Sequence, residues 1–329
     1  MSAVLVNLST AGCAPFPALL SEGRVMALAH WRADGLRGTS SMAEFLGEWD
    51  ANAELLKRLC ASQATRSVIE RRGVALEAFA LHEPVAPRQV FCTIGNYRCQ
   101  TMQAALDAEG TADERGRRDA TLASIEKRRR DGAPYVCLKG TAAIAGPFDP
   151  LLVEAEMSTL DWEVEIGVVM GRAARNVEAS RALDHVAGYC VVNDITLRER
   201  VIRRDVPTLG TDWLQSKSRE GWLPAGPWLV PAWDVERPAM LRPWLRLNGA
   251  SMQDGVAENM IFSIAEQIAY LSKRTSLQPG DLICTGTPAG IGSHYGRYLR
   301  AGDVIEAGVS GLGAQRTVCV DSIVAPRID

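Results

Sequence analysis

One stretch of alternating acidic and apolar residues, 160–170, constrains the fold more than any other part of the chain. Asp161, Glu163 and Glu165 stand at alternate positions, and a purely apolar run follows them. Successive side chains of a β-strand point to opposite faces, so a strand here places three carboxylates on one face. Neighbouring carboxylates repel and are costly to bury, so we expect positive charge opposite them, most simply a divalent cation with oxygen ligands.

The composition favours a globular protein that acts on small molecules. The net charge of −3 gives no reason to expect nucleic acid or a membrane as a partner, and no apolar run approaches the roughly 20 residues of a membrane helix. The N-terminal residues lack the basic and apolar regions of a signal peptide. The 8 cysteines are scattered without a C-x-x-C pair, which favours free thiols and a cytoplasmic protein.

The distribution of short apolar runs predicts an α+β fold. Residues 1–86 predict a small N-terminal α/β appendage, with strands at 4–8 and 24–29 and a helix from Ser40 to about Ala61. Two prolines in the segment 81–88 indicate a linker, and we place the domain boundary after residue 86. Residues 87–329 then form the main domain, whose many short strands and few helices are typical of a β-dominated α+β architecture.

The segment 101–132 is rich in alanine and in charges of both signs. Such a balanced charge pattern is most often a helical face in contact with solvent. A long charged excursion between strands can also serve as a mobile lid over a site, and this alternative stays open.

A second acidic position completes a candidate metal site. A predicted strand at 186–192 delivers Asp194 at its end, so Glu163, Glu165 and Asp194 would form an all-oxygen site suited to Mg²⁺, Mn²⁺ or Ca²⁺. From spacing alone, a solvent-facing sheet edge is an equally good interpretation, and Asp161 is better placed beside the ligands than among them. The chain has no phosphate-binding loop, no dinucleotide fingerprint, no H-E-x-x-H and no G-x-S-x-G.

Ordered blocks along the chain carry a resemblance to a known family. The blocks cover residues 94–97, 134–139, 160–171, 186–198, 215–217, 223–227, 247–249, 259–263 and 277–292. Together they resemble the fumarylacetoacetate hydrolase family, also called the fumarylpyruvate or acylpyruvate hydrolase superfamily, from about residue 90 to 320. The resemblance implies a mixed β-roll catalytic domain, usually a homodimer, and a divalent metal, Mg²⁺ first, held by Glu163, Glu165 and Asp194.

The resemblance also implies the chemistry. Family substrates are 2-oxo acids, often β-diketo acids, and the reactions are C–C hydrolysis, decarboxylation or isomerisation. A metal that chelates the carboxylate and the 2-oxo group acts as a Lewis acid when the C–C bond breaks. We therefore expect a metal-dependent hydrolase or decarboxylase in the catabolism of aromatic or related compounds. The first alternative is an isomerase or tautomerase of a 2-hydroxydienoate or 2-oxo acid.

Residue roles follow by matching positions. Lys217 matches the family's active-site lysine and would supply a fixed positive charge. Thr287, Tyr97 and Arg198 are the candidate substrate-binding residues; Thr287 would bind a carboxylate from the glycine-rich loop. Lys139 would balance charge behind the ligands.

Two glutamines depart from the family pattern. Family hydrolases place a His and a Glu, which activate water, at the positions of Gln100 and Gln103. Glutamine cannot act as a general base near neutral pH. A decarboxylase or isomerase would need no such base, a hydrolase could use a relocated base such as His294, and a protein that binds metal with weak or no catalysis is the remaining alternative. A lone histidine at 294 is more often structural.

Overall fold

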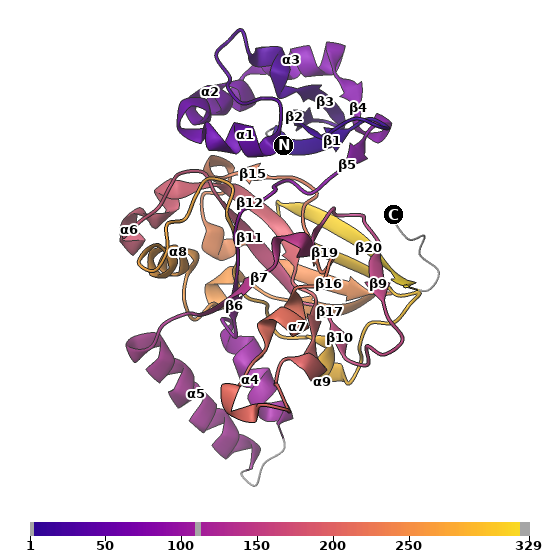
Figure 1. The fold of residues 1–329 in the computed structure, drawn as a ribbon. Coiled ribbons are helices and arrows are strands. Elements are labelled where there is room, and N and C mark those ends of the chain that lie inside the picture. The colour runs from indigo at the N-terminus through magenta and orange to yellow at the C-terminus, as the bar shows by residue number, and fades with distance from the viewer. Residues whose placement is uncertain (1–2, 109–112, 323–329) are drawn as a thin grey trace.

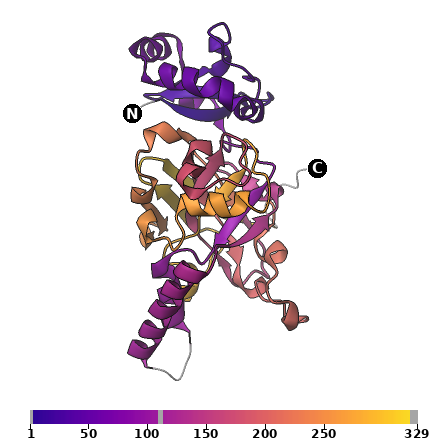
Figure 2. The same ribbon diagram turned by 90° about the vertical axis from the view of Figure 1, so that its left-hand side faces the viewer.

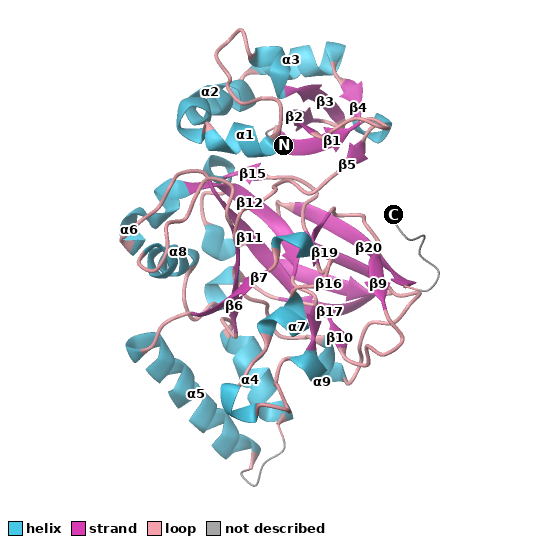
Figure 3. Ribbon diagram, viewed as in Figure 1, coloured by secondary structure: helices cyan, strands magenta, loops and turns pink. Residues whose placement is uncertain are grey.

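The computed structural model describes residues 3–108 and 113–322. An N-terminal unit stands beside a larger main domain, and the α4–α5 pair projects from the opposite end (Figures 1 and 2). Helices and strands occur in both the N-terminal unit and the main domain, which confirms the predicted α+β class (Figure 3).

The N-terminal unit is an antiparallel sheet in the order β4-β3-β2-β1-β5, packed with three helices. Its elements are β1 (Val4–Ser9), β2 (Phe16–Ser21), β3 (Arg24–Ala27), α1 (Met42–Gly47), α2 (Trp49–Ala61), α3 (Gln63–Arg72), β4 (Val74–Ala75) and β5 (Ala80–Leu81). The sequence did not predict β2, which contains Pro17 and was assigned to the connection between the two predicted strands. The predicted helix is divided at Glu48, and the Ser41 hydroxyl caps α1 by accepting from the Glu44 N–H at 3.2 Å.

The main domain contains two large sheets that pack against each other. The six-stranded sheet runs β15-β12-β11-β18-β6-β7, and the five-stranded sheet runs β17-β16-β19-β20-β9. Strands β11 and β12 contact β16, β19 and β20 across the interface (Figure 1). The first sheet comprises β6 (Val90–Ile94), β7 (Tyr135–Lys139), β11 (Val164–Met170), β12 (Val186–Asn193), β15 (Val230–Pro231) and β18 (Leu282–Cys284). The second comprises β9 (Leu151–Val153), β16 (Pro243–Leu247), β17 (Ala250–Asp254), β19 (Val304–Val309) and β20 (Gly313–Asp321).

Two small strand pairs and several short helices complete this domain. The pairs are β10 (Leu160–Asp161) with β13 (Thr196–Leu197), and β8 (Ile144–Ala145) with β14 (Leu223–Pro224). The helices are α4 (Arg98–Asp107), α5 (Glu114–Asp131), α6 (Ala179–Ala182), α7 (Trp213–Lys217), α8 (Ile264–Ser272) and α9 (Gly292–Tyr295). The residues from Leu197 to about Asp205 have a basic sequence pattern that predicts a helix, but only one 3₁₀ turn, η5 (Arg198–Arg200), forms there. Ile202 instead pairs with Thr211 in an isolated bridge, and Pro207 disfavours a helical conformation at Val206.

The described residues of the segment 101–132 are mainly helical, in α4 and α5, as expected from their charge pattern. Ile125 of α5 packs with Ile261 and Phe262, while most of the helix surface is exposed. Residues 109–112, between α4 and α5 in the sequence, lie outside the described part of the chain, and the lid stays a prediction.

The N-terminal unit contacts the main domain through paired backbone and aromatic groups. The backbone groups of Leu5 and Leu229 exchange two N–H to C=O hydrogen bonds of 3.0 and 2.9 Å. The rings of Trp49 and Trp233 stack with their centroids 5.8 Å apart. The connection between β5 and β6 contains the boundary placed after residue 86, which also stays a prediction. No helix in residues 3–108 or 113–322 is long and apolar enough to cross a membrane.

Candidate active site

Three carboxylates meet at the ends of β11 and β12. Ligand oxygens of Glu163, Glu165 and Asp194 all lie within 4.8 Å of one another, and all three residues are buried. Antiparallel pairing sets this geometry, because Val164 is opposite Asn193 and the Asp194 N–H donates to the Glu163 carbonyl at 2.8 Å. The solvent-facing sheet edge is therefore excluded for these residues.

Asp161 does not share the strand of the other two acids. It belongs to β10, in a separate strand pair, and residues 162–163 interrupt the predicted continuous strand. Side-chain oxygens replace the backbone partners here: Asp161 accepts from the Trp162 N–H at 2.8 Å, and Asn193 accepts from the Glu163 N–H at 2.9 Å. Asp161 consequently lies beside the metal candidates, where the sequence placed it.

Two buried lysines face the carboxylates. Lys217 donates to Asp194 at 2.5 Å, to Glu163 at 3.1 Å and to the Thr196 hydroxyl at 2.6 Å. Lys139 donates to the other oxygen of Asp194 at 2.7 Å. An ammonium has three donor hydrogens, so Lys217 has none to spare and acts here as a fixed charge.

These charges shift the pKa values of Asp194 and Glu165 in opposite directions. Burial alone would raise the pKa of Asp194, but Lys139 and Lys217 outweigh it and lower that pKa to about 2. Burial, followed by the charges of Asp194 and Glu163, holds the pKa of Glu165 well above its ordinary value. Glu165 is thus the carboxyl that most lacks a counter-charge. The pKa of Lys217 is raised because the two carboxylates overcome the opposing effect of burial.

Arg198 joins Asp161 to the metal candidates. Its Nε donates to Asp161 at 2.8 Å and its Nη1 pairs with Glu163 at 2.6 Å. The buried Nη2 has no hydrogen-bond partner within the described part of the chain. Arg198 therefore keeps one donor for a further anionic group.

The glycine-rich loop closes the site from the other side. Gly286 has a φ of +95°, and its N–H donates to Glu165 at 2.7 Å; a Cβ at Gly286 would lie 2.8 Å from that of Asn96. The Thr287 hydroxyl donates to the Val164 carbonyl at 2.9 Å and accepts from Gln253 at 2.8 Å. Since its only proton is committed, Thr287 would have to turn before donating to a substrate carboxylate.

Sequence reasoning missed Gln253. This buried side chain of β17 accepts from the Val164 N–H at 3.1 Å and donates to Thr287 and to the Pro288 carbonyl. It thereby holds β11 to the glycine-rich loop. A single glutamine in a strand, 89 residues from its partner, gives no signal in the sequence.

A cavity of about 100 Å³ adjoins the charged cluster. It is lined by Thr93, Ile94, Gly95, Gln100, Glu163, Arg198, Trp213, Lys217 and Thr287. The structure thus brings Gln100, Lys217, Arg198 and Thr287 around one space. Glu163 is the carboxylate that faces it directly.

Three other predicted residues lie elsewhere. Tyr97 is fully buried outside the cavity lining, and its hydroxyl has no partner among the described residues; burial and then the charge of Glu165 raise its pKa well above the ordinary value. His294 pairs with Asp107 at 2.8 Å and does not line the cavity. Gln103 accepts from the Gly290 N–H at 2.7 Å, so it anchors the glycine-rich loop.

Comparison with known protein families identifies the family to which the chain belongs. The model of the fumarylacetoacetate hydrolase C-terminal family matches residues 89–320. The chain therefore belongs to the fumarylacetoacetate hydrolase family, and the enzymes of this family act on oxo acids as hydrolases or isomerases.

Individual relatives narrow the comparison. A Burkholderia multivorans protein, provisionally named a hydrolase, is 44% identical over 185 residues, which are 55% of this chain and 64% of that relative's length. A Mycobacterium abscessus structure provisionally named a 2-hydroxyhepta-2,4-diene-1,7-dioate isomerase is 28% identical, with a TM-score of 0.70 over 98% of this chain and 100% of its own. Maleylpyruvate hydrolase from Sphingobium, solved with manganese(II) and pyruvate, shares the fold at 20% identity and a TM-score of 0.70, covering 97% and 99% of the two chains.

Proposed function

We propose that this protein is a divalent-metal-dependent enzyme that acts on a C–C bond of a 2-oxo acid, as a hydrolase or decarboxylase. The observation that carries the proposal is the buried trio of Glu163, Glu165 and Asp194, with oxygens within 4.8 Å of one another beside a small cavity. Buried acids at such a separation need a positive partner, and the lysines supply it only to Glu163 and Asp194.

The residues fit a divalent cation. All three candidate ligands are carboxylates, which hard cations prefer, and the raised pKa of Glu165 marks the place where a further positive charge is missing. We propose Mg²⁺, with Mn²⁺ or Ca²⁺ as alternatives. When bound, the cation would act as a Lewis acid on the 2-oxo group.

The other residues bind and orient the substrate. The free Nη2 of Arg198 would donate to the 1-carboxylate, and the pairs of Arg198 with Asp161 and Glu163 hold its guanidinium in place. Lys217 keeps Glu163 and Asp194 ionised and adds positive potential next to the cavity.

The residues that line the cavity favour one of the reactions we consider over the other. No described residue of this lining is a histidine, and Gln100 lines it at the position to which the family resemblance assigns a water-activating histidine. Decarboxylation breaks its C–C bond without proton removal by the protein, so the lining favours it over hydrolysis. The likeness to the M. abscessus protein, 28% identical, favours isomerisation as the second candidate.

The experiment is a paired set of turnover assays. Oxaloacetate, acetylpyruvate and fumarylpyruvate are each incubated with Mg²⁺ or Mn²⁺ and, separately, with EDTA. Metal-dependent loss of CO₂ from oxaloacetate without acylpyruvate cleavage supports the decarboxylase, and cleavage supports the hydrolase. Asp194→Asn should abolish either activity, while Asp254→Asn, an exposed acid of β17, serves as the control. Metal binding without any turnover would leave only a binding function.

We also propose a cytoplasmic homodimer. All 8 cysteines are free thiols, which suits a reducing compartment. In the described sheet, β7 is an edge strand that exposes Tyr135 and Leu138, and exposed apolar edges favour pairing with another chain. Sedimentation equilibrium giving a monomer at micromolar concentration would contradict the dimer.

A further inference from the structure

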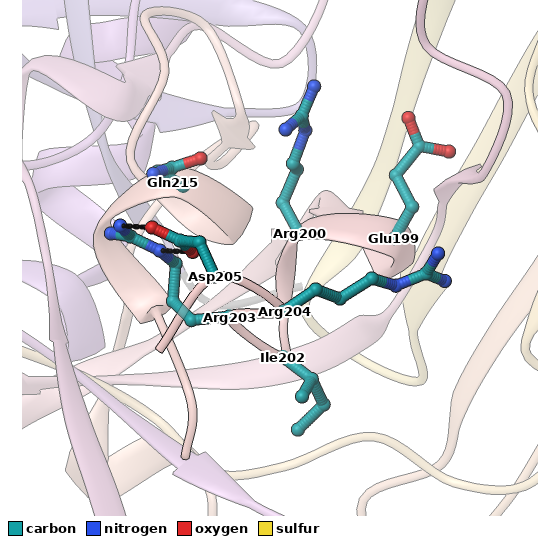
Figure 4. Close-up of a pocket in the computed structure, with 7 residues that line it drawn as sticks. All are labelled: Glu199, Arg200, Ile202, Arg203, Arg204, Asp205 and Gln215. Atoms are coloured by element: carbon teal, nitrogen blue, oxygen red, sulfur yellow. Dashed lines mark hydrogen bonds and ion pairs between the residues drawn. The ribbon is translucent and has the colours of Figure 1, made fainter. Parts of the chain in front are cut away.

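A second, larger cleft is lined by residues that come from the same short elements, η5 and α7, as Arg198 and Lys217 of the catalytic cavity. It has a volume of about 370 Å³, and seven side chains line it, namely Gln215 and six of those in the segment 199–205 (Figure 4). A smaller cleft of about 240 Å³ shares Arg200 and Gln215 with it and adds Arg219. The segment 199–205 contains three arginines, Arg200, Arg203 and Arg204, and the proposed chemistry gives none of them a role.

The charges in the larger cleft are unequally committed. Arg203 forms a two-bond pair with Asp205 (Figure 4). It also pairs with Asp212 at 2.9 Å. Glu199 accepts from the hydroxyls of Ser158 and Thr159. Its own acids are thus engaged, and the cleft has spare positive charge.

Arg200 and Arg204 supply that spare charge. Neither makes a hydrogen bond or ion pair with another residue in the ranges that the structure describes, although the charge of Arg200 contributes to lowering the pKa of Glu199 behind its hydroxyl partners. In Figure 4 both guanidinium groups extend without a dashed line to any of the drawn residues. Planar guanidinium groups without partners are suited to carboxylate or phosphate oxygens.

The same two short elements supply both sites. In η5, Arg198 lines the catalytic cavity and Arg200 lines the cleft; in α7, Lys217 lines the cavity and Gln215 lines the cleft. The cavity, at about 100 Å³, is far smaller than the roughly 300–1,000 Å³ of pockets that enclose drug-sized ligands. It can hold the 2-oxo acid end of a substrate, so the remainder must continue over neighbouring residues.

We propose that the cleft of Arg200 and Arg204 binds a distal anionic group, a carboxylate or a phosphate, of the substrate whose 2-oxo acid end enters the cavity. The inference rests on the proposed function and adds a substrate class to it. Arg200, which lines both clefts, is the main contact, and Arg204 contributes the second charge. Because the cleft is open to solvent, each contact is weaker than a buried ion pair.

The test compares two acylpyruvates that differ only at the distal end, one a carboxylate and the other its methyl ester. Steady-state kinetics are measured for the wild-type protein, Arg200→Ala, Arg204→Ala and the double variant. For the carboxylate, KM should rise about three- to tenfold per arginine, with kcat nearly unchanged, because exposed charge-assisted contacts are of modest strength. For the methyl ester, KM should stay within about twofold. Arg130→Ala, an exposed arginine of α5 paired with Asp131, controls for the change in net charge.

Two further measurements distinguish a carboxylate from a phosphate as the bound anion, and test the cleft separately from the proposed reaction. Inorganic phosphate should compete with the carboxylate substrate in the wild type and lose this effect in the double variant. An equal rise in KM for both substrates, or an unchanged KM for the carboxylate, would overturn the inference. If no variant turns over either compound, calorimetric binding of the same pair still tests the cleft: a carboxylate preference that depends on Arg200 supports it while the proposed reaction fails.

Discussion

Replacing Lys217 by methionine tests the electrostatic core of the site. The substitution removes a buried cation that makes three hydrogen bonds, to Asp194, Glu163 and Thr196, and keeps a similar volume. Removing one partner of a buried ion pair typically costs about 3–5 kcal/mol. Asp194 keeps Lys139 at 2.7 Å and Glu163 keeps Arg198 at 2.6 Å, so we take the lower end, about 3 kcal/mol. At about 2 °C per kcal/mol for a chain of this size, Tm should fall by about 6 °C.

Scanning calorimetry in EDTA measures this fall, and repeating it with Mn²⁺ adds a second result. A divalent cation held by the same carboxylates restores positive charge, so Mn²⁺ should narrow the gap between variant and wild type. Lys273→Met, which removes an exposed lysine paired with Glu178 at 3.3 Å, should shift Tm by no more than about 1 °C. A fall below 1 °C for Lys217→Met would refute the charge argument, and a gap unchanged by Mn²⁺ would refute the cation site.

Three more predictions test separate parts of the molecule. Because burial and then the charges of Asp194 and Glu163 raise the pKa of Glu165, protons compete with the cation, and Mn²⁺ affinity measured by calorimetry should fall as the pH is lowered towards that pKa. In the metal-free protein the protonated Glu165 favours folding, so its contribution to the free energy of unfolding is lost as the pH rises through the raised pKa; an Mn²⁺ affinity that does not depend on pH would contradict the assignment. Gln103→Ala leaves the Gly290 N–H without its acceptor and should lower the free energy of unfolding in urea by about 1 kcal/mol. Gln100 lines the cavity, so Gln100→Ala should change kcat/KM and leave the free energy of unfolding unaltered; the opposite pair of results would exchange the roles of the two glutamines. Trp49→Ala removes the ring stacked on Trp233 and should cost about 3–5 kcal/mol, seen as earlier melting of the N-terminal unit, and an unchanged calorimetric profile would mean that this contact does not join the units.

The residues that the sequence could predict are those governed by strand periodicity. Glu163 and Glu165 share a face because their positions differ by two, and Asp194 follows the next strand. The break after Asp161 could not be predicted, because it depends on Asp161 and Asn193 side chains accepting backbone hydrogens that a strand neighbour would otherwise bind. The basic segment after Leu197 has a helical pattern of charges, and tertiary pairing of Ile202 with Thr211 overrides it.

The charge count of the whole cluster connects the two binding proposals. Four carboxylates, Asp161, Glu163, Glu165 and Asp194, face three cations, Lys139, Lys217 and Arg198, which leaves −1 when all are ionised. A divalent cation changes the sum to +1, and the carboxylate of one 2-oxo acid brings it to zero. Since uncompensated buried charge is costly, the cluster should accept a 2-oxo acid well only after the metal. A further carboxylate that the reaction does not consume, at the distal end of a longer substrate, would add a net negative charge to the cluster, so we place it outside the cavity, in the cleft where Arg200 and Arg204 carry unused charge.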